Sequence, residues 1–488
     1  MSPTVAQRRE ALEERSETIP LAVDLDGTLI KTDMLWESLI ALLKTNVFAI
    51  FLLPFWLIKG RAYLKHEIAR RITLDVATLP FNKEFLAFLQ EEHKRGRVLI
   101  LTTASDRTIA EKIADHLGIF SEVMASNGKH NLKAAEKSRA LQEKFGNKCF
   151  DYAGNEKADL EVWAHTNAAI LVNAPDGALK KAQRLTPVIK VYNNNQDNTL
   201  TAIVRVIRVK HWIKNALVFV PLLASHQLID FALLLNGTYA FIGFSLVASS
   251  VYVFNDLADL NNDRHHHQKR HRPFASGELS LLSGLIMMHV LLIGAILVSL
   301  LLPVGFLFTL LGYYVLNVAY SLYLKKALLV DVLSLATFYA ARVFAGGAAT
   351  GIMPSEWLLA FCVFIFLSLA FAKRVSELQF LRENNKEKAH GRGYLPNDLE
   401  SLASLGATSG YIGVLVFALY INSPEVNQLY SYPRALWIAC PFLLYWISRL
   451  WLLVHRHEVP EDPIVFVIND KVSYLVGFAV SVTLVLAS

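Results

Sequence analysis

The chain has 488 residues, of which 53% are hydrophobic, and carries a formal net charge of +6 at pH 7. Its mean hydropathy of +0.35 is high for a soluble protein, and the hydrophobic residues are concentrated after Val209. The positive charge lies mainly in short loops between apolar segments, and no basic patch is interleaved with aromatic residues. This composition predicts a membrane protein with a soluble N-terminal part and argues against nucleic acid as a partner.

The N-terminal part contains short apolar runs that end in polar motifs. Pro20–Val23 predicts a buried strand, which delivers the sequence DLDGTLIKTD into a loop. A second predicted strand ends in small hydroxyl residues. The motifs, in chain order, are DLDGTLIKTD (Asp24–Asp33), RVLILTTAS (Arg97–Ser105), NLKAAEKSRAL (Asn131–Leu141) and FDYAGNEKAD (Phe150–Asp159).

These motifs resemble those of the haloacid dehalogenase (HAD) phosphohydrolase superfamily, which implies an α/β, Rossmann-like domain over residues 1–195. By this resemblance Asp24 is the nucleophile that accepts a phosphoryl group, and Asp26 is the general acid and base. Thr103 and Lys137 would hold the phosphoryl oxygens. The resemblance also implies a Mg²⁺ site, with ligands from Asp24, Asp26, Asn155 and Asp159.

Position 155 departs from the superfamily pattern, because Asn155 stands where many relatives have an aspartate. An amide oxygen still binds magnesium, so we expect weaker metal binding rather than none. A degenerate domain that only scaffolds or regulates is the alternative.

Between the first two motifs, residues 35–80 form an insertion that HAD proteins use as a helical cap. Its centre, VFAIFLLPFWLI (Val47–Ile58), is strongly apolar but too short to cross a bilayer. The sequence leaves two interpretations open. The segment is either packed within the cap or touches the membrane and admits a lipid-linked substrate.

A linker at 196–210 leads to a predicted all-α membrane domain over 211–488. Nine apolar segments approach the roughly 20 residues that a transmembrane helix needs. The loops with many Lys and Arg residues alternate with loops that have almost none. This pattern predicts the inner (cytoplasmic) membrane, a cytoplasmic HAD domain, both active sites on the cytoplasmic side and the C-terminus outside. The predicted spans are 212–230, 234–254, 279–301, 304–322, 328–349, 356–372, 403–421, 433–453 and 472–487.

Acidic residues cluster at the end of the second predicted span, in NDLADLNND (Asn255–Asp263). On a continuing helix, Asp256, Asp259 and Asp263 are spaced i, i+3 and i+7 and share one face. Carboxylates crowded in this way need a cation, and oxygen ligands suit Mg²⁺ that also holds substrate phosphates. The segment therefore predicts a magnesium-diphosphate site.

The membrane part is similar to UbiA-type intramembrane prenyltransferases, a fold of nine helices with a cavity on the cytoplasmic side. This similarity is carried by NDLADLNND followed by KRHRPFASG (Lys269–Gly277). Three further stretches favour the branch that makes decaprenyl-phosphate phosphoribose. They are RVKHWIKN (Arg208–Asn215), YSLYLKK (Tyr320–Lys326) and EDPIVFVIND (Glu461–Asp470).

One stretch departs from the usual family pattern. Where ordinary members have a second aspartate-rich motif, this chain has AKRVSEL (Ala372–Leu378), with Lys373 and Arg374 in place of acids. Cations at this position suggest that the protein binds additional phosphate directly. Phosphoribosyl pyrophosphate has such a group, its 5-phosphate.

The sequence therefore predicts transfer of 5-phosphoribose from phosphoribosyl pyrophosphate to a polyprenyl phosphate in the membrane lipid. The HAD domain would then remove the 5-phosphate to give polyprenyl-phosphoribose. Asp256, Asp259 and Asp263 would hold Mg²⁺, and Lys373 and Arg374 would bind the 5-phosphate. The other predicted phosphate contacts are Lys214, Asn255, Arg264, Lys269, Arg272, Lys325 and Lys326.

Two other functions stay open at this point. One is a prenyltransferase that moves an isoprenoid from its diphosphate to an aromatic acceptor, with a regulatory or degenerate HAD domain. The other is a transporter or receptor whose acids line a pathway. A homo-oligomer is also left open.

Arg342 lies inside the fifth predicted span, where a charge is costly and usually faces a partner or a cavity. Asp331, eleven residues earlier, can share its helix face. An ion pair of Arg342 with Asp331 and a substrate contact are equally compatible with the sequence.

Overall fold

The computed structural model describes residues 19–193, 199–383, 393–460 and 463–488. Two compact units divide these residues. One contains the described residues up to Val206 together with Asn255–Ile286, and the other contains Ile207–Phe254 and Met287–Ser488. The acidic segment therefore packs with the N-terminal residues, although it follows a membrane-type helix in the sequence.

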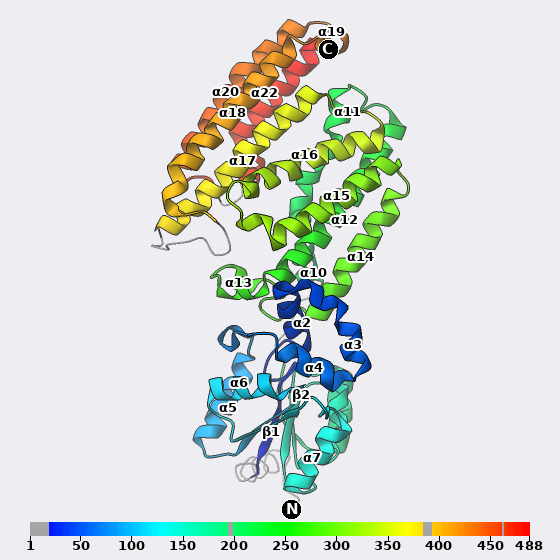
Figure 1. Cartoon of the computed structure of the whole chain (residues 1–488), viewed down its shortest axis with the longest axis vertical. Coiled ribbons are helices and arrows are strands. Elements are labelled where there is room, and N and C mark those ends of the chain that lie inside the picture. The colour runs from blue at the N-terminus through cyan, green and yellow to red at the C-terminus, as the bar shows by residue number, and fades with distance from the viewer. Residues whose placement is uncertain (1–18, 194–198, 384–392, 461–462) are drawn as a thin grey trace, which may run out of the picture. The chain divides into compact units, whose positions relative to one another are not determined.

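The first unit is built on a six-stranded parallel sheet, which is seen in the lower part of Figure 1. The strand order is β3-β2-β1-β4-β5-β6, with β1 at the centre between β2 and β4. This arrangement confirms the predicted α/β domain. The strands are β1 (Leu21–Asp24), β2 (Leu99–Asp106), β3 (Glu122–Ser126), β4 (Asp151–Gly154), β5 (Ala169–Val172) and β6 (Val188–Tyr192).

The residues of β1 alternate between two hydrophobic cores. Leu21 and Val23 belong to a core with helices on one face of the sheet, and Ala22 belongs to a second core on the other face. All three are fully buried, as expected for a central parallel strand that is covered on both sides. Asp24 follows as the last residue of the strand, so its carboxylate stands at the carboxyl edge of the sheet.

The first unit also contains short helices, of which α2 to α5 lie in the insertion between β1 and β2. They are α2 (Met34–Thr45), α3 (Leu53–Ile58), α4 (Arg61–Ala69), α5 (Lys83–Lys94), α6 (Arg107–Leu117), α7 (Ala135–Phe145), α8 (Leu160–Trp163), α9 (Asp176–Leu185) and α10 (Thr199–Ile207), with 3₁₀ turns at Val47–Phe51, Val76–Thr78 and Lys157–Asp159.

The apolar segment of the cap divides into a buried and an exposed set of side chains. Ala49 and Trp56 pack into the core, whereas Phe48, Phe51, Phe55 and Ile58 are between 66% and 83% exposed. The exposed aromatic and aliphatic surface excludes complete packing within the cap. Contact of this surface with the membrane stays a prediction.

The second unit is a helical bundle in which the helices from α15 onward pack largely against the next long helix in the sequence. Helix α16 contacts α15 and α17, α17 contacts α18, and α20 lies between α18 and α22. The helices are α11 (Val220–Ala224), α12 (Phe231–Ala258, up to Phe254 in this unit), α14 (Leu281–Ser299), α15 (Val304–Leu322), α16 (Val330–Thr350), α17 (Glu356–Glu383), α18 (Leu399–Ile421), α19 (Pro424–Leu429), α20 (Ala439–His455), α21 (Pro463–Asn469) and α22 (Lys471–Ala487). In the first unit, α13 (Leu260–His265) follows α12.

Within the described residues, seven helices are long and apolar enough to cross a membrane. The protein is therefore an integral membrane protein, but the predicted count of nine spans is not confirmed. The first predicted span, 212–230, is instead a 3₁₀ stretch (Val209–Phe219) followed by the short α11, where Pro221 lies in the first turn. The last one is α22, whose 17 residues are shorter than the usual crossing length.

The 3₁₀ stretch packs tightly against α16. A Cβ atom added to Gly346 would lie 1.9 Å from the carbonyl oxygen of Val218, so only glycine permits this approach of the two backbones. Small residues have the same role at helix contacts in other membrane bundles. The predicted first span is thus replaced by an irregular segment that is held against the bundle.

Candidate functional site

Asp24 and Lys137 form a buried pair at the carboxyl end of β1. The Lys137 Nζ donates to Asp24 Oδ1 at 2.7 Å and to the Tyr152 hydroxyl at 2.9 Å. Burial raises the pKa of Asp24 to about 7, and the charge of Lys137 opposes this rise. The predicted nucleophile and the predicted phosphate-binding lysine are therefore brought together.

Asp26 is held by donors from two directions. Its Oδ1 accepts the backbone N–H of Met34 at 2.7 Å, and its Oδ2 accepts the Ser105 hydroxyl at 2.7 Å and the Thr103 hydroxyl at 3.4 Å. Burial raises the pKa of Asp26 to about 6. A carboxyl group that is fixed and partly protonated near neutral pH suits the predicted general acid and base. Thr103 meets Asp26 here, and its predicted contact with a phosphoryl oxygen stays a prediction.

The two predicted metal ligands of the fourth motif, Asn155 and Asp159, have different hydrogen-bond partners. Asp159 Oδ2 accepts the backbone N–H groups of Asn155 and Glu156, both at 2.9 Å, and Asp159 Oδ1 accepts the Tyr152 hydroxyl at 2.8 Å. These hydrogen bonds shape the loop around Asn155. Metal binding by Asp159 stays a prediction.

Asn155 lies directly against the first motif. Its Oδ1 accepts the Thr28 hydroxyl at 3.2 Å, and a Cβ atom on Gly27 would lie 2.1 Å from its Nδ2. Gly27 also has a φ of +74°, which favours glycine. Oxygens of Asp24, Asp26 and Asn155 fit Mg²⁺, and the raised pKa of Asp24 indicates a carboxylate that a further cation would stabilise.

Three residues near this site were not predicted from the sequence. Ser105 binds Asp26, Tyr152 connects Lys137 with Asp159, and Lys65 of α4 donates to the carbonyl oxygen of Ala104 at 2.6 Å. Burial lowers the pKa of Lys65. Ser105 could have been noted because it ends the TTAS motif, whereas nothing in the local sequence distinguishes Lys65.

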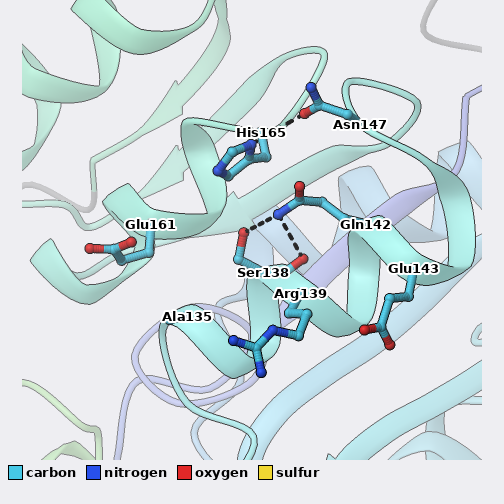
Figure 2. Close-up of a pocket in the computed structure, with 8 residues that line it drawn as sticks. All are labelled: Ala135, Ser138, Arg139, Gln142, Glu143, Asn147, Glu161 and His165. Atoms are coloured by element: carbon cyan, nitrogen blue, oxygen red, sulfur yellow. Dashed lines mark hydrogen bonds between the residues drawn. The ribbon is translucent and has the colours of Figure 1, made fainter.

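A separate hollow of about 550 Å³ lies beside α7 and α8. Figure 2 shows its lining, with Gln142 hydrogen-bonded to Ser138 and His165 to Asn147. The lining contains none of the predicted site residues, so this hollow is distinct from the Asp24 site. Its residues are Ala135, Ser138, Arg139, Gln142, Glu143, Asn147, Glu161 and His165.

The acidic segment bends where α12 ends at Ala258 and α13 begins at Leu260. The backbone bonds from Asp259 to Asn255 and from Asp263 to Asp259, both 2.8 Å, nevertheless keep a helical course. Arg272 Nη1 contacts Asp256 Oδ1 at 3.1 Å and Asp263 Oδ2 at 2.7 Å. The predicted shared face is therefore confirmed for Asp256 and Asp263, and a guanidinium lies between their carboxylates.

The donors of this segment fit a magnesium ion bound together with a phosphate group. Burial raises the pKa of Asp263 to about 6, although Arg272 opposes the rise, so a further cation would stabilise the carboxylates. In the part of the chain that the structure describes, no three acidic, His or Cys side chains are placed to hold a metal ion unaided. Phosphate oxygens of a substrate would complete the coordination, as is usual for Mg²⁺.

Arg264, another predicted phosphate contact, pairs with Glu37 of α2. Its Nη1 and Nη2 lie 3.2 and 2.5 Å from the two Glu37 carboxylate oxygens. The remaining predicted contacts in this segment, Asn255 and Lys269, are half-buried. Of the predicted contacts in the second unit, Lys214, Lys325 and Lys373 are half-buried and Lys326 is exposed. Their phosphate binding stays a prediction.

Arg374 is buried inside the second unit and lies in helix α17, which continues to Glu383, beyond the predicted end of this span at residue 372. Its guanidinium forms two hydrogen bonds with Asp331, one of them 2.9 Å long, and contacts Glu377 at 2.5 Å. The Tyr320 hydroxyl donates to Asp331 at 2.7 Å. The predicted phosphate ligand is thus held by two carboxylates.

Arg342 has other partners than the predicted one. Its Nε donates to Asn215 Oδ1 at 2.8 Å and its Nη2 to the Tyr313 hydroxyl at 3.0 Å. Of the two interpretations that the sequence left open for Arg342, the ion pair with Asp331 is not formed, because Arg374 from the neighbouring helix binds Asp331 instead. The substrate contact stays untested. Asp331 and Arg342 lie on the same helix, but this did not make them partners, because Arg374 of α17 is better placed to bind Asp331.

The fold and these sites define a membrane-embedded enzyme that carries a hydrolase-type α/β domain. The chain belongs to the UbiA prenyltransferase family, whose model matches residues 216–470. Residues 21–163 match the haloacid dehalogenase-like hydrolase model. Both parts that the sequence motifs predicted are therefore shown.

Relatives cover the whole chain or its membrane part. An uncharacterized protein, y4nM, of Sinorhizobium fredii is 36% identical over 96% of this chain and 91% of its own length. A decaprenyl-phosphate phosphoribosyltransferase of Mycolicibacterium smegmatis is 30% identical over 58% of this chain and 91% of its own length. A solved UbiA homolog from Archaeoglobus fulgidus, bound to GPP and Mg²⁺, is 14% identical with a TM-score of 0.46, and the match covers 58% of this chain and 97% of that structure.

Proposed function

We propose that the protein transfers 5-phosphoribose from phosphoribosyl pyrophosphate to a polyprenyl phosphate at the cytoplasmic face of the inner membrane. The similarity to a decaprenyl-phosphate phosphoribosyltransferase over most of that relative's length supports this substrate class. The loops rich in Lys and Arg support the cytoplasmic placement of both sites.

The observation that carries the proposal is the buried pair of Arg374 and Asp331. Prenyl diphosphate chemistry in this family uses a second acidic motif, as the sequence resemblance implies. In this chain Lys373 and Arg374 stand at the position of that motif, and the nearby carboxylates of Asp331 and Glu377 are paired with Arg374. One acidic segment, at Asp256–Asp263, remains for the diphosphate of a sugar donor.

In the proposed reaction, the bond between C1 of the ribose and the pyrophosphate breaks, and a phosphate oxygen of the lipid bonds to C1. Bound Mg²⁺, held by Asp256, Asp263 and Asp259, would neutralise charge on the departing pyrophosphate. Arg272 would bind the same leaving group, because it already lies between two of these carboxylates. Lys373 and Arg374 are the proposed contacts of the 5-phosphate.

We further propose that the HAD domain removes the 5-phosphate from the lipid product. Asp24 would attack the phosphorus while Asp26 protonates the leaving ribose oxygen, and Asp26 would then activate water to hydrolyse the aspartyl phosphate. Lys137 would bind a phosphoryl oxygen and keep Asp24 ionised. Together the two sites would yield polyprenyl-phosphoribose.

The test is mass spectrometry of the lipid made by the purified full chain from labelled phosphoribosyl pyrophosphate and polyprenyl phosphate. We expect pyrophosphate release and a lipid with ribose but without its 5-phosphate. Asp256→Ala should abolish transfer, and Asp24→Asn should leave a lipid that is heavier by one phosphoryl group. A label that never enters lipid, together with prenylation of an aromatic acceptor from a prenyl diphosphate, would establish the rival activity. An unchanged lipid from Asp24→Asn would exclude the phosphatase step.

A further inference from the structure

The segment that carries the acidic motif is docked on helix α2. Arg264 and Glu37 make a bidentate ion pair whose side chains are only 5% and 3% exposed. Two parallel N–H···O bonds between a guanidinium and a carboxylate fix orientation as well as distance. We call residues 259–278 the acidic loop.

Contacts on both sides of this ion pair extend the docking. His265 Nε2 lies 3.0 Å from Asp75 Oδ2, and the Thr78 hydroxyl donates to Asn261 Oδ1 at 3.3 Å. At the far end of the acidic loop, a Cβ atom on Gly277 would lie 2.6 Å from Cβ of Lys31. The loop therefore meets the cap and the first HAD motif at several separate points.

The ion pair is connected to the predicted transferase site through the loop itself. Arg264 Nε donates to the carbonyl oxygen of Ala275 at 3.1 Å, which ties the two ends of a turn together. Within this turn lies Arg272, whose guanidinium contacts Asp256 and Asp263. A displacement of Arg264 would therefore change where Arg272 lies between the two carboxylates.

We propose that Glu37 is a positioning residue for the transferase, so that a helix of the phosphatase-like domain holds the acidic loop in its working shape. The proposal rests on the proposed function, since it assigns Glu37 to the phosphoribosyl pyrophosphate and Mg²⁺ site. Buried ion pairs are poor sources of net stability but constrain geometry, and removing one partner leaves the other charge buried and unpaired. Without Glu37, Arg264 therefore leaves its place and the turn loosens.

The experiment compares Glu37→Gln with the wild-type full chain in lipid nanodiscs. Glutamine keeps the size and an acceptor oxygen but removes the charge. We expect the KM for phosphoribosyl pyrophosphate or the half-saturating Mg²⁺ concentration to rise about 10-fold, as for other groups that orient metal ligands, with a smaller change in kcat. Glu136→Gln is the matched control. It removes an exposed carboxylate that pairs with Arg139 in the same domain, and both constants should stay at wild-type values.

A second variant tests the pairing itself. Arg264→Gln alone should resemble Glu37→Gln. The double variant should be no worse than the poorer single variant, because both substitutions interrupt the same interaction. Additive losses would show that the two residues act separately and would overturn the proposal.

Hydrogen exchange gives a readout that does not depend on activity. In Glu37→Gln the amides of the acidic loop should exchange faster than in the wild type, while those of β1, β4 and β5 stay protected. Unchanged exchange overturns the docking, and faster exchange with unchanged kinetic constants overturns the positioning role. If the wild type transfers no phosphoribose, the proposed function fails, and the exchange comparison still decides whether Glu37 holds the loop.

Discussion

Lys137 reaches across from α7 to Asp24 at the end of β1, with 2.7 Å between Nζ and Oδ1. The two residues are 113 positions apart in the sequence and are both buried. Because burial raises the pKa of Asp24 while Lys137 opposes the rise, the lysine helps to keep the proposed nucleophile charged. The pair therefore links the fold of the sheet domain to its proposed chemistry.

Replacing this lysine should shift the pH profile of the phosphatase. In Lys137→Met the pKa of Asp24 should rise further, because the compensating charge is lost. The acidic limb of kcat/KM should therefore move to higher pH, and activity at neutral pH should fall about 10³-fold. The measurement is phosphate release from a phosphorylated sugar across pH. Lys137→Arg, which keeps the charge, should keep the acidic limb of the wild type, and a Met variant with that same limb would contradict this role.

Replacing Arg272 should weaken binding of the phosphoribosyl pyrophosphate donor without weakening binding of Mg²⁺. In Arg272→Gln the guanidinium no longer occupies the space between Asp256 and Asp263, so Mg²⁺ need not displace it. The leaving pyrophosphate also loses a cation. We expect the KM for phosphoribosyl pyrophosphate to rise about 10-fold, while the half-saturating Mg²⁺ concentration falls or is unchanged. Titrations of transfer with each ligand measure both constants. A parallel rise in both would instead indicate that Arg272 only supports the loop.

The Arg374–Asp331 pair should stabilise the bundle in addition to any role in binding. Arg374→Gln leaves Asp331 buried without its guanidinium partner, which should cost about 3 kcal/mol of unfolding free energy. Thermal unfolding in detergent measures the loss. Asp331→Asn/Arg374→Gln together should recover part of it, since neither charge remains. A double variant that is stable but has a raised KM for phosphoribosyl pyrophosphate would support the predicted 5-phosphate contact. A wild-type KM would show that the pair stabilises the bundle but does not bind the 5-phosphate.

The exposed side of the cap should touch lipid. A bimane label on Phe55→Cys, in a Cys149→Ser background, should be quenched by brominated lipids in nanodiscs, because Phe55 belongs to the exposed apolar surface. Cys149 is exposed and would otherwise react, whereas Cys362 and Cys440 are buried. The same label on Lys129→Cys, at an exposed polar position, is the control and should not be quenched. Equal quenching at both positions would argue against a specific lipid contact.

Much of the architecture follows from patterns that are local in the sequence. The apolar run before Asp24 predicts the central strand, and hydropathy predicts the long helices of the membrane part. The spacing of Asp256 and Asp263 predicts that they share a helix face, and the contacts of Arg272 with both carboxylates confirm it. Such features depend on neighbours along the chain, because the periods of strands and helices decide which side chains share a face. The boundaries at 195 and 211 between domain, linker and membrane part stay predictions.

The tertiary structure decided which distant charges meet. Asp331 pairs with Arg374 rather than with Arg342. Arg264 pairs with Glu37 of the cap. The carboxylate of Asp159 accepts hydrogen bonds from backbone N–H groups and from the Tyr152 hydroxyl. The tertiary structure also made the first predicted span a 3₁₀ stretch against Gly346. The physical reason is that a buried charge takes the partner with the best geometry among all neighbouring elements. Periodicity identifies the face on which a charge lies, but packing determines what that face meets.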